Sequence, residues 1–246
     1  MGTLARDLAE IAATRPLVIV HGGGAQSTEL GARLGVPVRK VAGLRVTDDA
    51  TLEVVKLALS GVNVELCAAL GAAGVRAVGL TGASALAIRA TRRAPLPTGE
   101  DLGHVGDVAG VESALFGTLT AAGYVPVLAC LGCDELGALY NINADTVATQ
   151  VARALHAAAL VLVSDVPGVL RDAADPRTRM PRLDAAHARA EIAAGTITRG
   201  MAVKLEEAFA ALAAGVPRIH IVGALAAGDL AAEMREPGSR GTVLVP

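Results

Sequence analysis

Residues 17–24 read LVIVHGGG, a run of four apolar residues followed by a histidine and three consecutive glycines. The run has the length and β-branched content of a buried strand, and residues 27–34 behind the glycines have helical period. Glycines allow close approach of the backbone to a ligand, and the N–H groups at a helix N-terminus attract anions. We interpret this unit as an anion cradle, with a plain tight turn as the alternative, since it matches neither the Walker A nor the G-x-G-x-x-G pattern.

The same alternation of short apolar runs and helical segments continues along the chain. It is typical of a parallel sheet covered by helices on both faces, so the sequence predicts an α/β protein. The predicted strands are residues 17–20, 36–41, 77–81, 125–131, 160–164, 219–222 and 242–245. The predicted helices are residues 3–13, 27–34, 48–70, 111–122, 144–155, 185–194, 201–214 and 225–234. The proline- and glycine-rich residues 94–110 predict a hairpin or flap, and the polar residues 171–182 a loop on the nucleotide side.

Composition excludes several classes of protein. The 246 residues carry a formal net charge of -2 and only 2% aromatic side chains, which leaves little from which to build a nucleic-acid-binding face. No stretch of about twenty residues is free of charged and turn-forming residues, as a membrane span requires. Arg6, Asp7 and Glu10 stand where a signal peptide would be apolar, so we expect a cytoplasmic protein.

The three cysteines are expected to be core residues rather than a disulfide framework. Cys130 and Cys133 have the C-x-x-C spacing of a redox or metal pair. They end a predicted strand instead of opening a helix, and no further ligands follow at matching spacing. We therefore predict no protein metal site.

Two motifs suggest recognition of a small acidic molecule. Residues 43–48 read GLRVTD, and the guanidinium of Arg45 can bind a carboxylate with two hydrogen bonds, although a surface arginine is the alternative. Residues 141–145 read NINAD, and their alternation places two amides and a carboxylate on one side of the chain as it enters a helix. Helix capping accounts for Asn143 and Asp145 but leaves Asn141 unexplained.

Two further motifs suggest phosphate chemistry. Residues 164–170, SDVPGVL, follow a strand carboxyl end, where open α/β sheets bind ligands. Residues 196–204, TITRGMAVK, place Lys204 on the predicted first turn of a helix. A lysine there opposes the helix dipole, and a bound phosphate would reverse the sign of that interaction.

In this order, the five motifs together with LGHVG at residues 102–106 resemble the acetylglutamate kinases of the amino acid kinase family, over residues 15–245. The resemblance implies a three-layer α/β/α fold with one continuous, open, mainly parallel sheet. Residues 1–158 would form an N-terminal lobe for the acyl amino acid and for dimerisation, and residues 159–246 a C-terminal lobe for ATP with Mg²⁺. The implied reaction is phosphorylation of the side-chain carboxylate of N-acetyl-L-glutamate, the second step of arginine biosynthesis.

The resemblance also implies roles for single residues. The substrate-binding residues would be Gly23, Gly24, Arg45 and Asn141. The catalytic residues would be Lys204, which stabilises the transferring phosphoryl group, and Asp145, which orients the catalytic lysines. The nucleotide contacts would be Asp165, Val166, Pro167, Gly168, Val169, Leu170, Thr196, Ile197 and Thr198. No general base is needed, because the attacking carboxylate is ionised at neutral pH.

The sequence departs from the family pattern in two places. Family members open with a Lys-x-Gly-Gly strand that supplies a second phosphoryl-stabilising lysine, and this strand is absent here. We expect a truncated start rather than a natural variant, because losing a central strand would leave two unpaired inner edges. Residues 82–85 read GASA where many members carry Gly-x-Asp-Gly.

Other functions and the assembly stay open at this stage. The rivals are another kinase of the same fold, acting on an aminoadipate or glutamate carrier protein, carbamate, uridylate or aspartate, and a non-catalytic ligand-binding relative. We expect a homodimer without arginine feedback. Its predicted surface is the stripe Leu52, Val55, Leu59, Val62 and Leu66, and the alternative is that this stripe is core.

Overall fold

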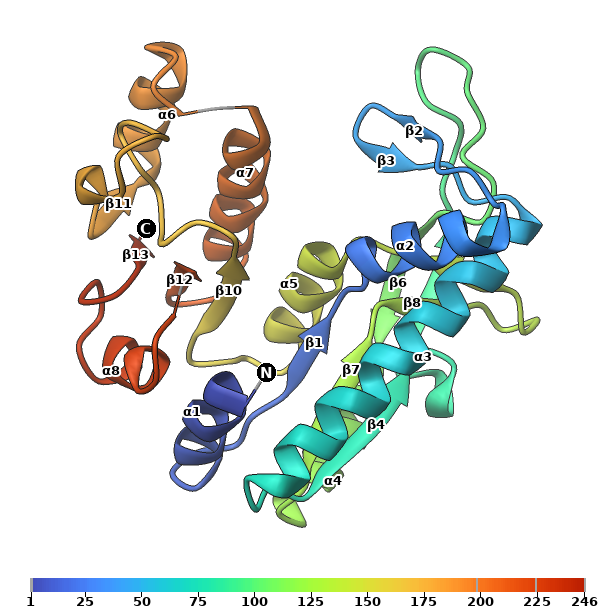
Figure 1. The fold of residues 1–246 in the computed structure, drawn as a ribbon, viewed down its shortest axis with the longest axis horizontal. Helices are drawn as coiled ribbons and strands as arrows, with labels where there is room; N and C mark the ends of the chain where they lie inside the picture. The colour runs from blue at the N-terminus through green and yellow to red at the C-terminus, as the bar shows by residue number, and fades with distance from the viewer. Residues whose placement is uncertain (1, 198, 224, 246) are drawn as a thin grey trace. The chain divides into compact units, whose positions relative to one another are not determined.

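The computed structural model describes residues 2–197, 199–223 and 225–245, which fall into two compact units (Figure 1). One unit comprises residues 16–147, and the other comprises residues 1–15 with 148–246. This division differs from the predicted boundary between residues 158 and 159, and it places the first helix with the C-terminal part of the chain. The assignment of substrate to one lobe and ATP to the other stays a prediction.

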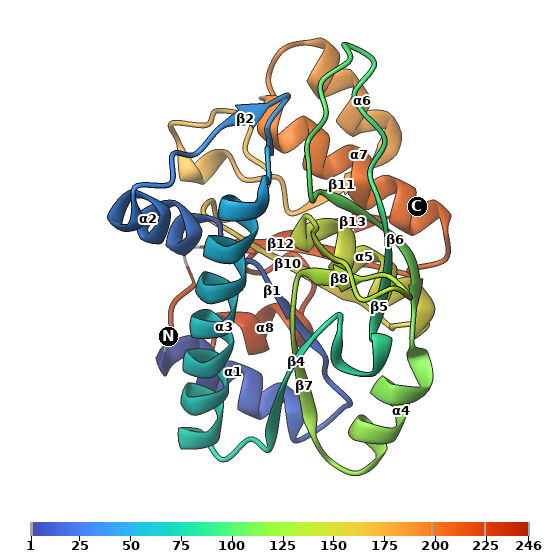
Figure 2. The ribbon, with the colours of Figure 1, turned by 90° about the vertical axis from the view of Figure 1, so that its right-hand side faces the viewer.

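The unit of residues 16–147 contains a parallel sheet with the strand order β1-β7-β4: β1 is Ile19–His21, β7 is Val125–Ala129 and β4 is Ala77–Thr81. Helix α3 (Asp49–Ala72) packs on one face of β4 and β7, and α4 (Ser113–Ala121) lies on the other (Figure 2). All five residues of β7 are buried, as a strand covered on both faces requires. Helix α2 (Gly24–Leu34) packs along α3.

Shorter strands complete this unit. A mixed sheet has the order β6-β5-β8-β9, and a separate hairpin joins β2 to β3. The bounds are Ile88–Arg92 for β5, Gly106–Val111 for β6, Leu131–Cys133 for β8, Leu139–Asn141 for β9, Lys40–Val41 for β2 and Leu44–Arg45 for β3. The antiparallel β5–β6 pair confirms the hairpin predicted around residues 94–110. The strand predicted at residues 36–41 is reduced to β2, and the one predicted at 125–131 breaks at Cys130 into β7 and β8.

The second unit is built on the sheet β10-β12-β13-β11. Its strands are Leu160–Ser164 for β10, Ile219–Gly223 for β12, Thr242–Val245 for β13 and Arg182–Asp184 for β11. Its helices are α1 (Gly2–Ala12), α6 (Ala185–Ala193), α7 (Arg199–Ala213), α8 (Asp229–Arg235) and the end of α5 (Ala144–Ala154). Leu160 and Leu162 face a core with α7, whereas Val161 between them faces a cluster with α1 and α8. This alternation of period two shows helices on both faces of the sheet.

Helix α1 belongs to this unit because it packs against α8, more than 200 residues away in sequence (Figure 1). The buried carboxylate of Asp7 accepts hydrogen bonds from the backbone N–H groups of Gly228 (2.8 Å) and Leu230 (2.9 Å) at the start of α8. Ile11 packs with Leu230, and Arg235 forms an ion pair with Glu10. Hydrophobic periodicity does not indicate that the carboxylate of one helix binds the N-terminus of another. The packing of α1 against α8 could therefore not be predicted from the sequence.

The described strands form four hydrogen-bonded sheets, each within one of the two units, and the continuous sheet through both units stays a prediction. β1 stands at one edge of its sheet, beside β7, and β10 stands at one edge of its own, beside β12. No described strand pairs with the free edge of β1 or with the free edge of β10. Hydrogen bonding therefore ends at each of these two strands.

Four of the five residues of the predicted dimer stripe on α3 are core, the alternative interpretation. Leu52, Val55, Leu59 and Val62 are each 9% exposed or less, and they face the interior of their own unit. The fifth, Leu66, is half-buried. The opposite side of α3 carries Leu57, 58% exposed, and other apolar residues. By length and composition α3 is also the one described helix that could cross a membrane. Its high apolar content has two sources, because one face packs in the core of its unit and the opposite face carries exposed apolar residues.

A buried carboxylate organises the end of the second unit. Glu233 on α8 is fully buried and accepts four hydrogen bonds, from His220 Nδ1 on β12 (2.7 Å) and from the backbone N–H groups of Gly238, Arg240 and Gly241 (2.7–2.9 Å). Burial raises the pKa of this carboxyl, but the hydrogen bonds outweigh that effect and the pKa lies below its usual value. The segment before β13 is thereby held to α8.

We predict that Glu233→Ala lowers the free energy of unfolding by about 3–5 kcal/mol, because it leaves buried polar groups without a partner. Glu236→Ala, at an exposed position just beyond α8, is the matched control and should change it by less than about 0.5 kcal/mol. Because the pKa of Glu233 is depressed in the folded state, its contribution is present above the unfolded pKa and is lost as pH falls through the folded pKa. Urea unfolding at neutral and acidic pH measures both effects, and equal losses in the two variants would contradict the assignment.

Candidate active site

The unit of residues 16–147 contains a pocket of about 320 Å³. It is formed where β1 meets α2, by the β2–β3 hairpin, and where β9 leads into α5. Four residues predicted to bind substrate line it, although they come from three distant parts of the sequence: Gly23, Gly24, Arg45 and Asn141. The predicted convergence is therefore what the structure shows, while the role of each residue stays a prediction.

The glycines form a helix N-terminus beside the pocket. Gly23 is the N-cap of α2, and the first backbone N–H bonded within the helix is that of Ser27, to the Gly23 carbonyl (2.8 Å). The N–H groups before Ser27 have no partner within α2. A side chain at Gly22 would place its Cβ 3.3 Å from that of Ala144, and one at Gly23 would place it 3.0 Å from Leu59 Cδ2. The glycines thus allow the backbone to lie tightly between α5 and α3 while its N–H groups remain available to an anion.

Arg45 is tied to this helix end. Its Nη2 donates to the carbonyl of Gly24 (3.1 Å) and to Thr28 Oγ1 (2.9 Å). Burial lowers the pKa of Arg45, but a guanidinium stays protonated at any physiological pH. The charge of the arginine and the partial positive charge of the helix N-terminus therefore lie next to each other.

Lys40 is a pocket residue that the sequence analysis missed. Ala42 and Gly43 both have positive φ, at 49° and 82°, and make the two-residue turn that pairs Lys40 with Arg45 across the hairpin. Two cations directly opposite each other on one face destabilise a hairpin, so the pairing concentrates positive charge at the pocket. Among the described residues that line the pocket there are two cations and no carboxylate. The two-residue turn Ala42–Gly43 could have identified Lys40 in the sequence, because it pairs residue 40 with residue 45.

The segment around Asn141 closes another side of the pocket. Asn141 Nδ2 donates to Thr47 Oγ1 (3.2 Å), and its backbone N–H donates to the His104 carbonyl (2.8 Å). Asn143 Oδ1 accepts from the backbone N–H of Asp145 (3.0 Å), so Asn143 does cap α5. Asp145 lies in the first turn of that helix, one residue beyond the pocket-lining Ala144.

The thiols fit the core interpretation. Cys130 is buried in the pocket wall, and burial, together with a smaller effect of the Asp145 charge, raises its pKa to about 12. A thiol with that pKa is not a nucleophile or a metal ligand at neutral pH. Within residues 2–197, 199–223 and 225–245, no group of three or more His, Cys, Asp and Glu side chains could hold a metal ion.

The predicted nucleotide loop, residues 165–170, lies at the carboxyl end of β10 in the second unit. Gly168 has φ 150°, and a Cβ there would lie 2.7 Å from Thr242 Oγ1 and 3.1 Å from Arg179 Cδ. The backbone N–H of Val169 donates to Thr242 Oγ1 (2.8 Å), and the Val169 carbonyl accepts from the N–H of Met180 (2.8 Å). The loop is thus packed against the first residue of β13.

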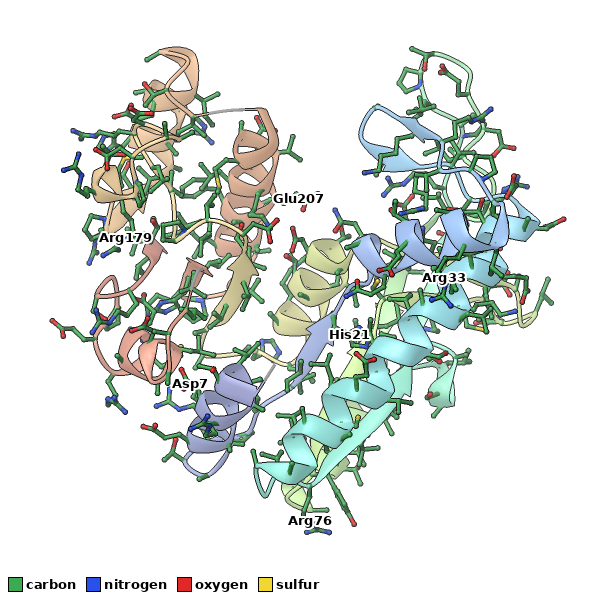
Figure 3. The ribbon with its side chains drawn as sticks, viewed as in Figure 1. Asp7, His21, Arg33, Arg76, Arg179 and Glu207 are labelled. Carbon is green, nitrogen blue, oxygen red and sulfur yellow. The ribbon has the colours of Figure 1, made fainter. Side chains whose placement is uncertain are left out.

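Arg179 connects this loop to the segment that Glu233 holds (Figure 3). Its guanidinium donates to the carbonyls of Gly238 (3.0 Å), Ser239 (3.2 Å) and Gly241. The carbonyls of residues 238–241 therefore bind Arg179 while N–H groups of the same segment bind Glu233. Neither residue was singled out from the sequence, because a single arginine and a single glutamate carry no motif.

The remaining predicted residues need one correction. Helix α7 begins at Arg199, so Lys204 is its sixth residue and stands in the second turn, not the first. The argument from the helix dipole is therefore weaker than expected, since that effect falls off within one turn. Thr196 is half-buried, and Ile197 is buried in the core of the second unit, so only its backbone can contact a ligand. Thr198 lies outside the described residues.

Comparison with known proteins agrees with this geometry. A sequence model described as the amino acid kinase family matches residues 1–223. An acetylglutamate kinase from Sorangium cellulosum (strain So ce56) is 58% identical over 254 residues, covering 100% of this chain and 89% of that protein. One from Anaeromyxobacter dehalogenans (strain 2CP-1) is 54% identical, covering 98% and 92%. One from Methanopyrus kandleri is 45% identical, covering 80% and 82%.

Solved structures confirm the predicted fold class. The structure of smu.665 from Streptococcus mutans UA159 has a TM-score of 0.79 and 30% identity, covering 99% of this chain and 91% of that one. The N-acetylglutamate synthase from Neisseria gonorrhoeae, complexed with coenzyme A and N-acetyl-glutamate, has a TM-score of 0.87 and 25% identity, covering 100% and 55%. A carbamate kinase from Giardia lamblia bound to AMP-PNP shares the fold alone, at a TM-score of 0.71 and 12% identity, covering 99% and 88%. The chain belongs to the amino acid kinase family.

Proposed function

We propose that this chain transfers the γ-phosphoryl group of ATP to the side-chain carboxylate of N-acetyl-L-glutamate, in the cytoplasm, as a step of arginine biosynthesis. The observation that carries the proposal is the pocket in which Arg45 and the N-terminus of α2 converge, since two positively polarised groups suit an acidic substrate. The acetylglutamate kinases that are 45–58% identical to the chain support the choice of acceptor.

The substrate side of the reaction is assigned to the pocket. Arg45 pairs with the α-carboxylate of N-acetylglutamate, and the amide of Asn141 hydrogen-bonds the substrate. The N–H groups of Gly23 and Gly24 face the transferring phosphoryl group. The γ-carboxylate is already ionised at neutral pH, so it attacks without a general base while the bond from the γ-phosphorus to the ADP oxygen breaks.

The nucleotide side is assigned to the second unit. Residues 165–170, 196 and 197 contact ATP, and Lys204 stabilises the phosphoryl charge. Asp145, which belongs to the unit of residues 16–147, is assigned the role of orienting the catalytic lysines. Positioning and charge stabilisation supply most of the rate of such transfers. Mg²⁺ bound with the nucleotide would neutralise phosphate charge.

An acceptor assay tests the proposal. The product is an acyl phosphate, which hydroxylamine traps as a hydroxamate. We expect ATP-dependent product with N-acetyl-L-glutamate and little with glutamate, aspartate, carbamate or a glutamate carrier protein. A preference for one of the latter would assign the chain to another kinase of this fold. ATP binding by calorimetry without transfer to any acceptor would indicate a non-catalytic relative.

We predict that Lys204→Ala and Asp145→Ala each lower kcat far more than they raise KM, by roughly 10²-fold or more, because both act on charge that develops in the transition state. Steady-state kinetics with both substrates measures the two constants. Weaker substrate binding with an unchanged kcat would remove these residues from the catalytic step.

We predict that Arg45→Lys raises the KM for N-acetylglutamate by roughly tenfold and leaves the KM for ATP unchanged, because an ammonium cannot form two parallel hydrogen bonds to a carboxylate. Arg33→Lys, at an exposed position on α2 outside the pocket, is the control (Figure 3). Equal KM values for the two variants would exclude Arg45 from substrate binding.

The assembly is proposed to be a homodimer through the outer side of α3. Leu57 and Val64 are 58% and 68% exposed and lie seven residues, or two turns, apart on that side. A second copy of the same helix would cover both, as a two-fold interface requires.

We predict a mass of 49.4 kDa in light scattering, twice the 24.7 kDa of one chain, and a shift toward 24.7 kDa for the double variant Leu57→Lys and Val64→Lys. Val203→Lys on α7, where the wild-type valine is 57% exposed, is the control and should leave the dimer intact. A monomeric wild-type chain, or a dimer that survives the double substitution, would contradict this surface.

A further inference from the structure

A buried histidine stands directly before the glycine cradle, and nothing in the proposed mechanism uses it. His21 ends β1 and is 8% exposed, and its ring lies between β1 and α3 (Figure 3). Its Nδ1 lies 3.0 Å from the Gly22 carbonyl oxygen, and its Nε2 lies 2.9 Å from Asn63 Nδ2. His21 itself does not line the pocket, whereas Gly22, Gly23 and Gly24 do.

The hydrogen bonds determine which nitrogen carries the proton. A carbonyl oxygen only accepts, so Nδ1–H donates to Gly22, and Nε2 accepts from the Asn63 amide. That amide also donates to the Val127 carbonyl (2.8 Å), which fixes its orientation. Burial lowers the pKa of His21, against a smaller opposite effect of the bond to Gly22, so the ring is neutral at neutral pH. His21 is thus held as one tautomer in one orientation.

Asn63 occupies a niche that only a glycine leaves open. An ideal Cβ on Gly79, in the middle of β4, would lie 2.0 Å from Asn63 Oδ1. Cys67 Sγ donates to the same oxygen (3.8 Å). A glycine inside a strand lowers the stability of that strand, but here the missing Cβ leaves the space that the Asn63 amide occupies. The chain therefore contains a continuous set of contacts from β4 through Asn63 and His21 to the Gly22 carbonyl.

This carbonyl belongs to the same peptide group as the Gly23 N–H. The described chain has no cis peptide bond, and in a trans peptide the C=O and N–H point in opposite directions. Holding the Gly22 oxygen toward His21, away from the pocket, therefore directs the Gly23 N–H to the other side. Glycines on both sides of this peptide offer little resistance to its rotation, so the hydrogen bond is what defines its orientation.

We propose that His21, oriented by Asn63, is a positioning residue for phosphoryl transfer that fixes the direction in which the Gly23 N–H meets the transferring group. The inference rests on the proposed function. Preorganised backbone donors lower the barrier because they need no reorientation as charge develops. Losing the orientation affects kcat, whereas ground-state binding of substrate depends on Arg45 and Asn141.

Two amide substitutions at position 21 test the hydrogen bonds of Nδ1 and Nε2 separately. In His21→Asn the side-chain nitrogen takes the place of Nδ1 and retains the bond to Gly22. In His21→Gln the amide reaches the place of Nε2 and retains the contact with Asn63 but not that with Gly22. We expect His21→Asn to keep kcat within about threefold of wild type. We expect His21→Gln and His21→Leu to lower kcat by roughly 10- to 100-fold with less than threefold change in either KM.

Gly79→Ala tests the other end of the contacts, because it displaces Asn63 without touching His21 or the pocket, and it should lower kcat in the same way. Glu65→Ala, at an exposed position on α3 outside these contacts, is the control and should leave kcat unchanged. Thermal unfolding of each variant shows whether it is folded at the assay temperature. Affinity for ADP with tetrafluoroaluminate, a mimic of the transferring phosphoryl group, should fall in His21→Gln by the same factor as kcat, while affinity for ADP alone is unchanged.

The outcomes distinguish this inference from the proposed function. No transfer to N-acetylglutamate by the wild-type chain contradicts the proposed function. Wild-type transfer together with equal kcat values for His21→Asn and His21→Gln contradicts the positioning role alone. A folded His21→Gln variant in which only KM changes also contradicts it, because a fault in orientation must appear in kcat.

Discussion

The segments that are predicted to bind ligand depend on close contact between their backbone, or the side chains behind them, and the rest of the chain at glycines. Gly79 leaves room for the amide of Asn63, Gly22 lets the cradle lie against α5, and Gly168 lets the 165–170 loop lie against Thr242. At each of these positions a Cβ would meet a neighbouring atom at 2.0–3.3 Å, so even alanine would move the element. The glycines of this chain therefore do more than permit turns: they determine how near each binding segment comes to the scaffold that supports it.

In each unit a polar network holds backbone groups in or next to a segment that is predicted to bind ligand. In the unit of residues 16–147, Asn63 and His21 hold the Gly22 carbonyl. In the second unit, Glu233 holds backbone N–H groups of residues 238–241 while Arg179 binds the carbonyls of the same segment. Buried polar groups are costly unless their donors and acceptors are satisfied. The named contacts satisfy the Glu233 carboxylate and the Asn63 amide, whereas the buried Ser239 Oγ has no hydrogen-bond partner in the described structure. Such networks define position more sharply than apolar packing, because hydrogen bonds depend on direction as well as distance.

Much of the fold followed from periodicity, and the differences have physical causes. Each of the seven predicted strands contains or overlaps an observed one, and all eight helices are present. Two strands that were not predicted show why: β6 is rich in glycine, and β11 has three residues and forms by pairing with the distant β13, which a local pattern does not record. The start of α7 was placed too late because Gly200 is a poor helix former, although a first turn tolerates it. The predicted apolar stripe lies on one face of α3, but a helical period of 3.6 does not distinguish a face buried in its own chain from one buried against a second copy.

The site was predictable to the extent that it consists of motifs. Gly23, Gly24, Arg45 and Asn141 were found because each belongs to a short segment with recognisable chemistry, and they do line one pocket. Lys40 and Asn63 were not found, because their importance depends on a partner: Arg45 across a two-residue turn for one, and His21 for the other. A residue that contacts a ligand tends to be visible in sequence, whereas a residue that orients such a contact becomes visible only when the structure shows what it touches. His21 is such a residue, since only its two hydrogen bonds and the geometry of the peptide group between Gly22 and Gly23 indicate its role.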